Sequence, residues 1–244
     1  MSVVSGRLGL GELERRLLVA GAAAFGLSLD AASLDRFSQF ADLLGLWSAR
    51  MNLISCHTAR ELVERHLLDS LAVGPWIRDA ATIVDLGSGA GFPGVPLAIA
   101  LVEKRLILVE PRRRRANFLR EVKRTLGLVN VQIVETRAED GIRRAHLPLA
   151  DAVVCRAVWA EESVLGFTSA WLRPSGTLIR MRGTGAKGST QSAGVRSSMR
   201  RGTEKPTPEE RSSAKDMVVE RSVTYRIGTG HPRTLDICRR HAED

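Results

Sequence analysis

Apolar residues recur at helical spacing through the first part of the chain. They follow this period over residues 10–25, and a second set continues it over four turns at Leu34, Phe37, Phe40, Leu44 and Trp47. Asp30 is suited to cap the second helix. Thr58 and Glu61 have the spacing of a capping box, which predicts the start of a third helix. The pattern therefore predicts a helical region over residues 1–76.

The pattern then changes to short continuous apolar runs, as in strands that are buried on both faces. These runs cover residues 82–86, 106–110, 131–135, 152–156 and 176–181. Helical segments over residues 95–101 and 113–126 separate the first three. Strands that alternate with helices indicate parallel βαβ units, and the right-handed crossover rule then predicts a Rossmann-like doubly wound sheet. Residues 217–227 and 234–238 suit two closing strands, so we assign residues 77–244 to this α/β domain.

Residues 184–216 differ in composition from the rest of this predicted domain. Sixteen of these 33 residues are Ser, Thr, Gly or Pro, and none is Leu, Ile, Phe, Trp or Tyr. The segment is also basic. Because it lacks large apolar side chains it cannot form a core, and we expect a mobile segment here.

The overall composition excludes several classes of protein. The chain has 244 residues, of which 44% are hydrophobic and 26% charged, as in a folded soluble protein. The net charge of +9 permits an anionic partner without identifying one. The three cysteines form no CxxC pair, which argues against a zinc site and a disulfide framework and indicates a reducing compartment.

No run of about eighteen apolar residues predicts a membrane-spanning helix. A signal-peptide core over residues 17–29 is outweighed by Glu12 and Glu14, which precede it, and by the helical spacing of its apolar residues. We therefore expect a cytoplasmic protein that binds neither a membrane nor a metal.

A glycine-rich turn follows the first predicted strand, in the sequence DLGSGAGFPG that begins at Asp85. Glycines at this place let the backbone approach a ligand closely. Gly87, Gly89 and Gly91 complete an acidic-x-GxGxG pattern that suits S-adenosylmethionine, with Asp85 organising the loop or facing the cationic end of the cofactor. Gly89, Gly91 and Gly94 also satisfy the GxGxxG pattern of dinucleotide binding. The acidic residue favours the first interpretation.

Three polar side chains lie at the ends of predicted strands. Glu110 ends the second strand and is placed to accept hydrogen bonds from both ribose hydroxyls of an adenosine. Arg137 and Arg156 follow later strands, at the edge where open α/β sheets bind ligands. Two guanidinium groups there could hold a phosphate or a purine edge. Each arginine alone is equally consistent with a structural ion pair.

The densest charge cluster lies on the helix predicted over residues 113–126. Arg113, Arg114, Arg120 and Arg124 are predicted to contact RNA phosphates from its outward face. A merely solvated helix face is the alternative. No aromatic residues are interleaved with these cations to form a base-stacking platform, so single-strand binding by stacking is not indicated.

His66 and Asp69 lie three residues apart on the third predicted helix. This spacing could ligate a metal, but no third ligand is apparent, and packing with a hydrogen bond between them is the favoured interpretation. Asn52 is assigned to a local turn, and Trp47 to the core.

Several motifs in this chain resemble those of the bacterial small-subunit ribosomal RNA guanine-N7 methyltransferases, also called the glucose-inhibited division protein B family. They are MNLIS from Met51, RHLLDSL from Arg65, DLGSGAGFPGVPL from Asp85, Arg137-Ala138-Glu139 and Arg156-Ala157. The resemblance covers roughly residues 30–183. It implies a class I methyltransferase sheet with an N-terminal helical region and the cofactor S-adenosylmethionine.

The resemblance also implies roles for residues of the cofactor site. Gly87 and Phe92 would line the methionine and adenosine part of the pocket, and Glu110 would hold the ribose. Ala138 and Glu139 would flank the adenine.

The implied substrate is one guanine in the decoding-region loop of 16S rRNA, free or within the small ribosomal subunit. Arg156 would face the reacting end of the cofactor, and Arg137 would join it as a second catalytic residue. The family usually has a Lys-Gly pair followed by an acidic helix, whereas this chain has Arg182-Gly183 and then a basic segment. This departure leaves RNA contacts in the C-terminal third without a family counterpart.

Three other functions fit parts of the pattern. The first is a related methyltransferase that acts on another RNA or on a small molecule. A nicotinamide oxidoreductase would use the GxGxxG glycines, but no Tyr-x-x-x-Lys pair supports it. A non-catalytic RNA-binding protein could retain the cofactor pocket without using it.

Overall fold

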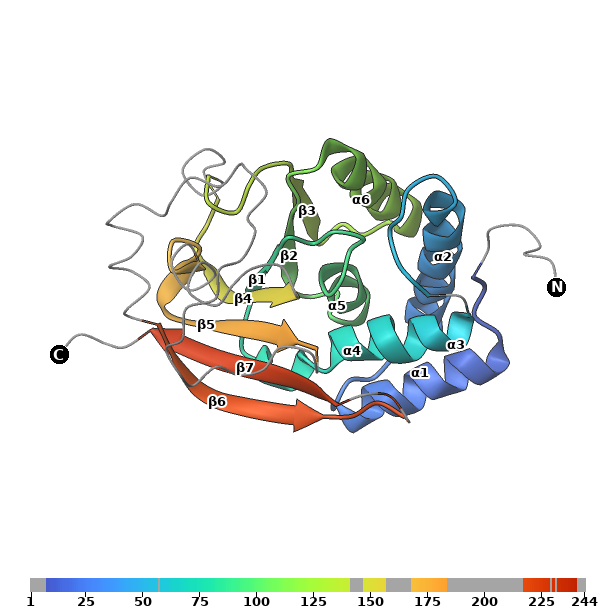
Figure 1. Ribbon diagram of the computed structural model, residues 1–244, viewed down its shortest axis with the longest axis horizontal. Helices are drawn as coiled ribbons and strands as arrows, with labels where there is room; N and C mark the ends of the chain where they lie inside the picture. Colours follow the sequence, from blue (N-terminus) through green and yellow to red (C-terminus); the bar gives the residue numbers. More distant parts are fainter. Residues whose placement is uncertain are drawn as a thin grey trace, which may run out of the picture.

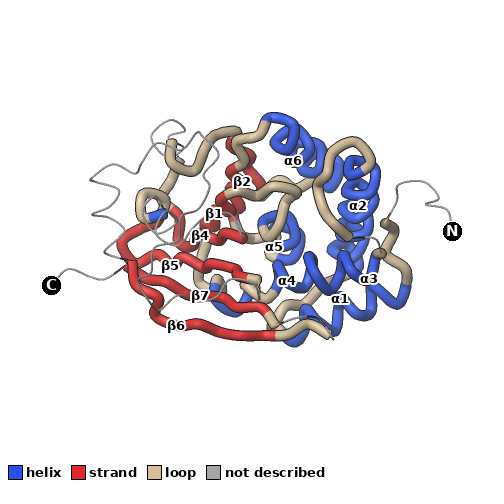
Figure 2. The backbone as a smooth tube through the Cα atoms, in the orientation of Figure 1, coloured by secondary structure: helices blue, strands red, loops and turns tan. Residues whose placement is uncertain are grey.

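The computed structural model describes residues 8–56, 58–140, 147–156, 168–183, 217–228, 230 and 232–240 (Figures 1 and 2). The segment predicted over residues 184–216 lies outside these ranges. The helices are α1 (Glu12–Ala24), α2 (Ala31–Ser48), α3 (Ala59–Leu62), α4 (Leu68–Leu71), α5 (Gly94–Ala100) and α6 (Arg113–Leu126), with a π-helical turn at Val63–Leu67 and a 3₁₀ turn at Gly74–Trp76. The strands are β1 (Thr82–Leu86), β2 (Arg105–Val109), β3 (Val131–Val134), β4 (Ala150–Arg156), β5 (Leu172–Arg182), β6 (Met217–Tyr225) and β7 (Arg233–Arg240).

These strands form one seven-stranded sheet in the order β3-β2-β1-β4-β5-β7-β6. Strands β1 to β5 pair in parallel with one another, and β7 lies antiparallel between β5 and β6. The order reverses at β1, because the chain first builds outward to β3 and then returns to β4 on the other side. The predicted Rossmann-like doubly wound sheet and its two closing strands are thus confirmed.

The N-terminal helices begin where the sequence predicts. The Asp30 carboxylate accepts a hydrogen bond from the Ser33 amide at 2.7 Å, and the Thr58 hydroxyl accepts one from the Glu61 amide at 3.1 Å. Such caps satisfy amide groups that have no partner within the helix. The third helix differs from the expected regular α-helix, because the chain widens into a π-helical turn over Val63–Leu67.

The N-terminal helices and one face of the sheet share a single hydrophobic core. Phe37 and Phe40 of α2 are fully buried in it with Phe118 of α6 and Leu108 of β2. Figure 1 shows α1 to α4 on one side of the sheet, with α2 beside α6. Each fully buried side chain of this kind contributes about 1.5–3 kcal/mol. The division of the chain at residue 76 stays a prediction.

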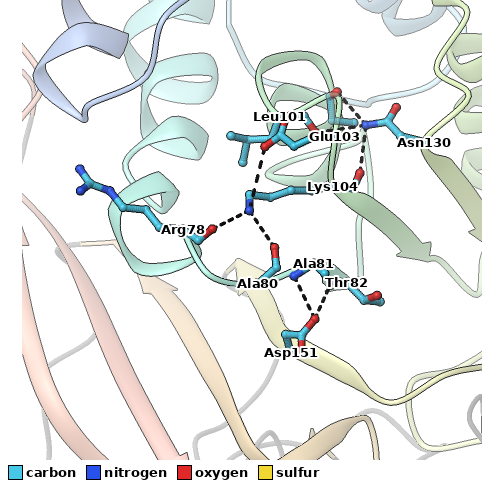
Figure 3. A network of polar contacts seen from close by, with 10 residues as sticks. Arg78, Ala80, Ala81, Thr82, Leu101, Glu103, Lys104, Asn130 and Asp151 are labelled. Atoms are coloured by element: carbon cyan, nitrogen blue, oxygen red, sulfur yellow. Dashed lines mark hydrogen bonds and ion pairs between the residues drawn. The ribbon is translucent and has the colours of Figure 1, made fainter.

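The amino-terminal edge of the sheet is closed by a buried polar network (Figure 3). Lys104 Nζ donates hydrogen bonds to the carbonyl groups of Arg78 and Ala80 at 2.7 and 2.8 Å. Asp151 accepts from the amides of Ala81 and Thr82, at the start of β1. Because this network binds backbone groups to one another, it stabilises the edge opposite to the one where α/β sheets bind ligands.

Candidate active site

The loop after β1 has the conformation that its glycines predict. Gly87, Gly89 and Gly91 have φ angles of 71°, 58° and 94°, in the left-handed region that side chains rarely adopt. A Cβ on Gly91 would lie 2.7 Å from Val95 Cγ2, whereas one on Gly89 would meet nothing closer than 3.8 Å. The backbone at Gly89 therefore has space beside it for a ligand.

Glu110 holds this loop in place. Its Oε2 accepts a hydrogen bond from the Gly89 amide at 2.9 Å, and its Oε1 accepts one from the Arg112 amide at 2.8 Å. The carboxylate is buried, and each oxygen keeps a second lone pair. Its predicted bond to a ribose is thus compatible with the two backbone bonds, and it stays a prediction.

Asp85 lies fully buried beneath the loop. Its Oδ2 accepts a hydrogen bond from the Gly94 amide at 2.9 Å, while Oδ1 has no hydrogen-bond partner in the described part of the chain. Burial raises the pKa of Asp85 to about 7, against the opposing effect of the Gly94 bond. A Cβ on Gly94 would collide with Leu108 and lie 2.6 Å from Asp85 Oδ2, so close packing accounts for the third glycine of the GxGxxG pattern.

Arg156, at the end of β4, joins this loop to the N-terminal helices. Its Nη2 donates to His66 Nδ1 at 3.2 Å, its Nη1 lies 3.5 Å from Asp69 Oδ2, and its Cζ lies 4.9 Å from the centre of the Phe92 ring. Burial, together with the charge of Arg156, lowers the pKa of His66 to about 3. The imidazole is therefore neutral at physiological pH and accepts the guanidinium hydrogen bond.

Asp69 is the acidic centre of this cluster. It is 2% exposed, and its Oδ1 accepts a hydrogen bond from the Tyr225 hydroxyl at 2.6 Å and lies 3.8 Å from Arg233 Nε. The prediction of a hydrogen bond between His66 and Asp69 is wrong: in the described part of the chain, the two side chains do not bond to each other. Arg156 lies between them and contacts both.

Sequence reasoning missed Tyr225 and Arg233 as members of this cluster. Both lie on the β6–β7 hairpin, which forms after a long connection, and no local pattern links them to a helix at the start of the chain. Burial, reinforced by the charge of Asp69, raises the pKa of Tyr225. Its hydroxyl therefore stays protonated and acts as a hydrogen-bond donor.

A cavity of about 170 Å³ opens beside Arg156. Its lining residues are Arg65, His66, Asp69, Arg156, Met181, Arg182, Gly183 and Arg233. Four arginines and a single carboxylate leave the cavity positively charged, which suits an anion. Its volume is below the roughly 300 Å³ of a typical small-molecule pocket, so a phosphate group or the edge of a base fits it better than a whole cofactor.

The remaining predicted site residues are dispersed around this centre. Phe92 is buried and packs on Phe40 and His66, with ring centres 5.4 and 5.0 Å away. Ala138 is buried and its carbonyl accepts a hydrogen bond from the Trp171 indole at 2.8 Å. Arg137 and Glu139 are exposed beside it, and Arg137 does not line the arginine-rich cavity. Their roles toward a cofactor or substrate stay predictions.

The four arginines of α6 that were predicted to contact RNA fall into two groups. Arg120 is paired with Glu135 at 2.7 Å, and Arg124 with Glu121 at 2.6 Å. Arg113 and Arg114 are exposed near the start of the helix, and within the described ranges neither has an ion pair or a side-chain hydrogen bond. The second group is therefore better prepared to meet phosphates, because it has no internal partner to give up.

The described residues hold neither a metal-binding cluster nor a membrane-spanning helix. No group of three or more His, Cys, Asp or Glu side chains there could hold a metal ion. None of the helices in those ranges is long and apolar enough to cross a bilayer.

The sheet order, the glycine loop after β1 and the carboxylate at the end of β2 define a class I Rossmann-like methyltransferase. Residues 33–217 match the family model described as rRNA small subunit methyltransferase G, and the chain belongs to this family. It is 34% identical over 171 residues to the ribosomal RNA small subunit methyltransferase G of Acetivibrio thermocellus. The aligned residues cover 69% of this chain and 71% of the relative.

The chain is also similar to a second relative and to a solved structure. The protein of the same description from Stenotrophomonas maltophilia strain R551-3 is 39% identical over 166 residues, or 68% of this chain and 76% of that one. Among solved structures, the precorrin-6y C5,15-methyltransferase of Geobacter metallireducens aligns with a TM-score of 0.42 at 15% identity, over 66% of this chain and 79% of that chain.

Proposed function

We propose that this protein transfers a methyl group from S-adenosylmethionine to N7 of one guanine in the decoding-region loop of 16S rRNA. Membership of the rRNA small subunit methyltransferase G family supports the reaction class. The observation that carries the proposal is the contact between the glycine loop and the arginine-rich cavity. Phe92 continues the loop and lies 4.9 Å from Arg156, so a cofactor on the loop and a nucleotide at the cavity would meet.

The residues present fit S-adenosylmethionine. The space beside Gly89 admits its close approach. Asp85 Oδ1, which has no hydrogen-bond partner among the described residues, offers negative charge to a cationic ligand when the carboxyl is ionised. The residues that would hold it are Asp85, Gly87, Gly89, Gly91, Phe92, Glu110, Ala138 and Glu139. Arg156 would face its reacting end and contribute little to its affinity. When bound, S-adenosylmethionine supplies a methyl group on a positively charged sulfur.

The chemistry at guanine N7 needs no general base, because N7 carries a lone pair and no proton. The work of the protein is therefore to align N7 with the methyl group. Arg156 and Arg137 orient the guanine edge or an adjacent phosphate, and binding energy from the rest of the RNA is used for this alignment. His66, which is neutral, and Asp69 hold Arg156 in place.

The affinity for S-adenosylmethionine is expected to rise with pH through about 7. The raised pKa of Asp85 leaves its carboxyl neutral below that value and ionised above it, and a cationic ligand favours the ionised form. Linkage then gives about tenfold weaker binding at about pH 6 than at about pH 8. Calorimetry on the wild type and on Asp85→Asn measures this, because the ligand's own titration is common to both. Equal pH profiles for the two proteins would contradict it.

Arg113 and Arg114 are expected to supply counterion-dependent affinity for RNA. Replacing both with glutamine removes two phosphate contacts, which lowers the slope of log affinity against log salt by about 1.4 for single-stranded RNA. Replacing Arg120 and Arg124 in the same way is the matched control, and a smaller change is expected because both are already paired with glutamates. Fluorescence anisotropy over a salt series gives the slopes. Identical slopes for all three proteins would show that this face does not contact RNA.

The proposed function is tested by methyl transfer from labelled S-adenosylmethionine to small ribosomal subunits from a strain that lacks this gene. Borohydride and aniline cleavage then locates any N7-methylguanine. A single cleavage in the decoding-region loop is expected. Binding of the cofactor without incorporation would keep the pocket and indicate another RNA, a small molecule or a non-catalytic role.

A further inference from the structure

A second cavity lies between the end of α2 and the start of α6, and it shares no lining residue with the arginine-rich cavity. Its volume is about 360 Å³, within the range of small-ligand sites, and its lining residues are Trp47, Arg50, Met51, Arg114 and Asn117. Helices α2 and α6 are in contact here, and Figure 1 shows them side by side. Of these lining residues, the function proposed above uses only Arg114, as a phosphate contact.

The cavity combines one aromatic wall with a cationic rim. Trp47 is half-buried and packs against Phe118, with ring centres 5.5 Å apart, so its indole is held in a fixed position. Met51 adds a second apolar wall. Arg50 and Arg114 are exposed at the rim, and neither has an ion-pair partner in the described parts of the chain.

We infer that this cavity binds one unpaired base of the RNA, stacked on Trp47, with Arg50 and Arg114 on the phosphates beside it. An unpaired nucleotide is the ligand that joins a planar apolar face to flanking anions, and proteins commonly bind the splayed bases of RNA loops on aromatic side chains. The inference rests on the proposed function, because it takes RNA as the substrate.

The location of the cavity agrees with a base near the target guanine. Phe40 contacts Phe92 in the candidate active site, and Trp47 lies two turns further along the same helix, or about 10 Å. On α6, the residue after Arg114 reaches the glycine loop, since a Cβ on Gly89 would lie 3.8 Å from Arg115 Nη1. The two helices that line the cavity therefore also contact the candidate active site.

The aromatic face is tested by two substitutions of Trp47. Trp47→Leu fills the space against Phe118 but removes the stacking surface, and we expect about fivefold or more weaker binding of an RNA hairpin with the decoding-region loop sequence. Trp47→Phe keeps an aromatic ring and is expected to lie near the wild type. Thermal unfolding of each variant checks the fold. If Trp47→Leu does not fold, the double variant Arg50→Gln/Arg114→Gln takes its place. Its control is Arg16→Gln, because Arg16 is an exposed arginine of α1 that is paired with Glu12.

The decisive measurement pairs these variants with hairpins that carry an abasic residue at one loop position at a time. For the wild type, we expect removal of the base at one position other than the target guanine to weaken hairpin binding about fivefold. In Trp47→Leu, or in the double variant, the same base removal should weaken binding less, because the effects of removing two groups that contact each other are not additive. Equal losses in both proteins at every position, or an affinity of the wild type that depends on no loop base, would overturn the inference. Methyl transfer by the wild type, measured separately, decides the proposed function.

Discussion

Replacement of Arg156 with alanine is expected to lower methyl-transfer turnover about 100-fold, equivalent to about 2.7 kcal/mol. The guanidinium lies against the Phe92 ring and is held by His66 and Asp69, so it is fixed where a substrate group would arrive. Without this guanidinium, N7 and the methyl group are misaligned, whereas the glycine loop that holds the cofactor remains in place. The affinity for S-adenosylmethionine should therefore change much less than turnover.

The control for this variant is Arg173→Ala. Arg173 lies in the same sheet but is half exposed and pairs with Asp151, far from the glycine loop. Single-turnover rates at saturating RNA, with cofactor affinity by calorimetry, separate the two effects. An unchanged rate in Arg156→Ala would refute the assignment. Equal losses in rate and in cofactor affinity would show that Arg156 binds the cofactor rather than orienting the substrate.

Most of the sheet could be predicted from the sequence, because parallel strands that are buried on both faces leave continuous apolar runs. Strand β1 has the predicted bounds. Strand β5 was predicted to begin at residue 176, yet it begins at Leu172. Its exposed residues 173–175 interrupt the apolar pattern, and the pairing with β4 shifts there from Ala150 opposite Leu172 to Ala152 opposite Thr177. An irregularity of this kind depends on the neighbouring strand and has no local signal.

The site was only partly predictable for a related reason. The glycine loop and Glu110 are local signals at the ends of successive strands, and the structure brings them together. Tyr225 reaches Asp69 from the far end of the chain, and Trp47 and Arg114 line one cavity because two helices pack together. The sequence suggested no stacking surface on the basic helix, because the aromatic residue of that cavity comes from α2.

Replacement of Asp236 with alanine is expected to destabilise the protein by about 3–5 kcal/mol. Asp236 on β7 is 1% exposed and binds Arg180 and Arg182 of β5, at 2.8 and 2.6 Å, and the Ser222 hydroxyl of β6 at 2.7 Å. This carboxylate thus joins three strands at the only antiparallel part of the described sheet. Its removal takes away a carboxylate that binds the buried Arg180 guanidinium.

The pH dependence of this loss distinguishes a charge effect from a packing effect. Burial by itself would raise the pKa of Asp236, but hydrogen bonds from Arg182, Ser222 and Arg180 outweigh it and the pKa is lowered. Its contribution to stability is therefore present above the unfolded pKa of about 4 and is lost as the pH falls through the lower, folded pKa. Urea unfolding should show a large difference between wild type and variant at pH 7 that shrinks in acid.

The control is Asp35→Ala, which removes the carboxylate of an exposed pair with Arg15. This substitution should cost less than about 1 kcal/mol. Equal costs for the two variants, or a difference for Asp236→Ala that does not depend on pH, would show that the buried pair contributes no charge-dependent stability. Because Arg182 also lines the arginine-rich cavity, the same carboxylate positions part of the proposed substrate site.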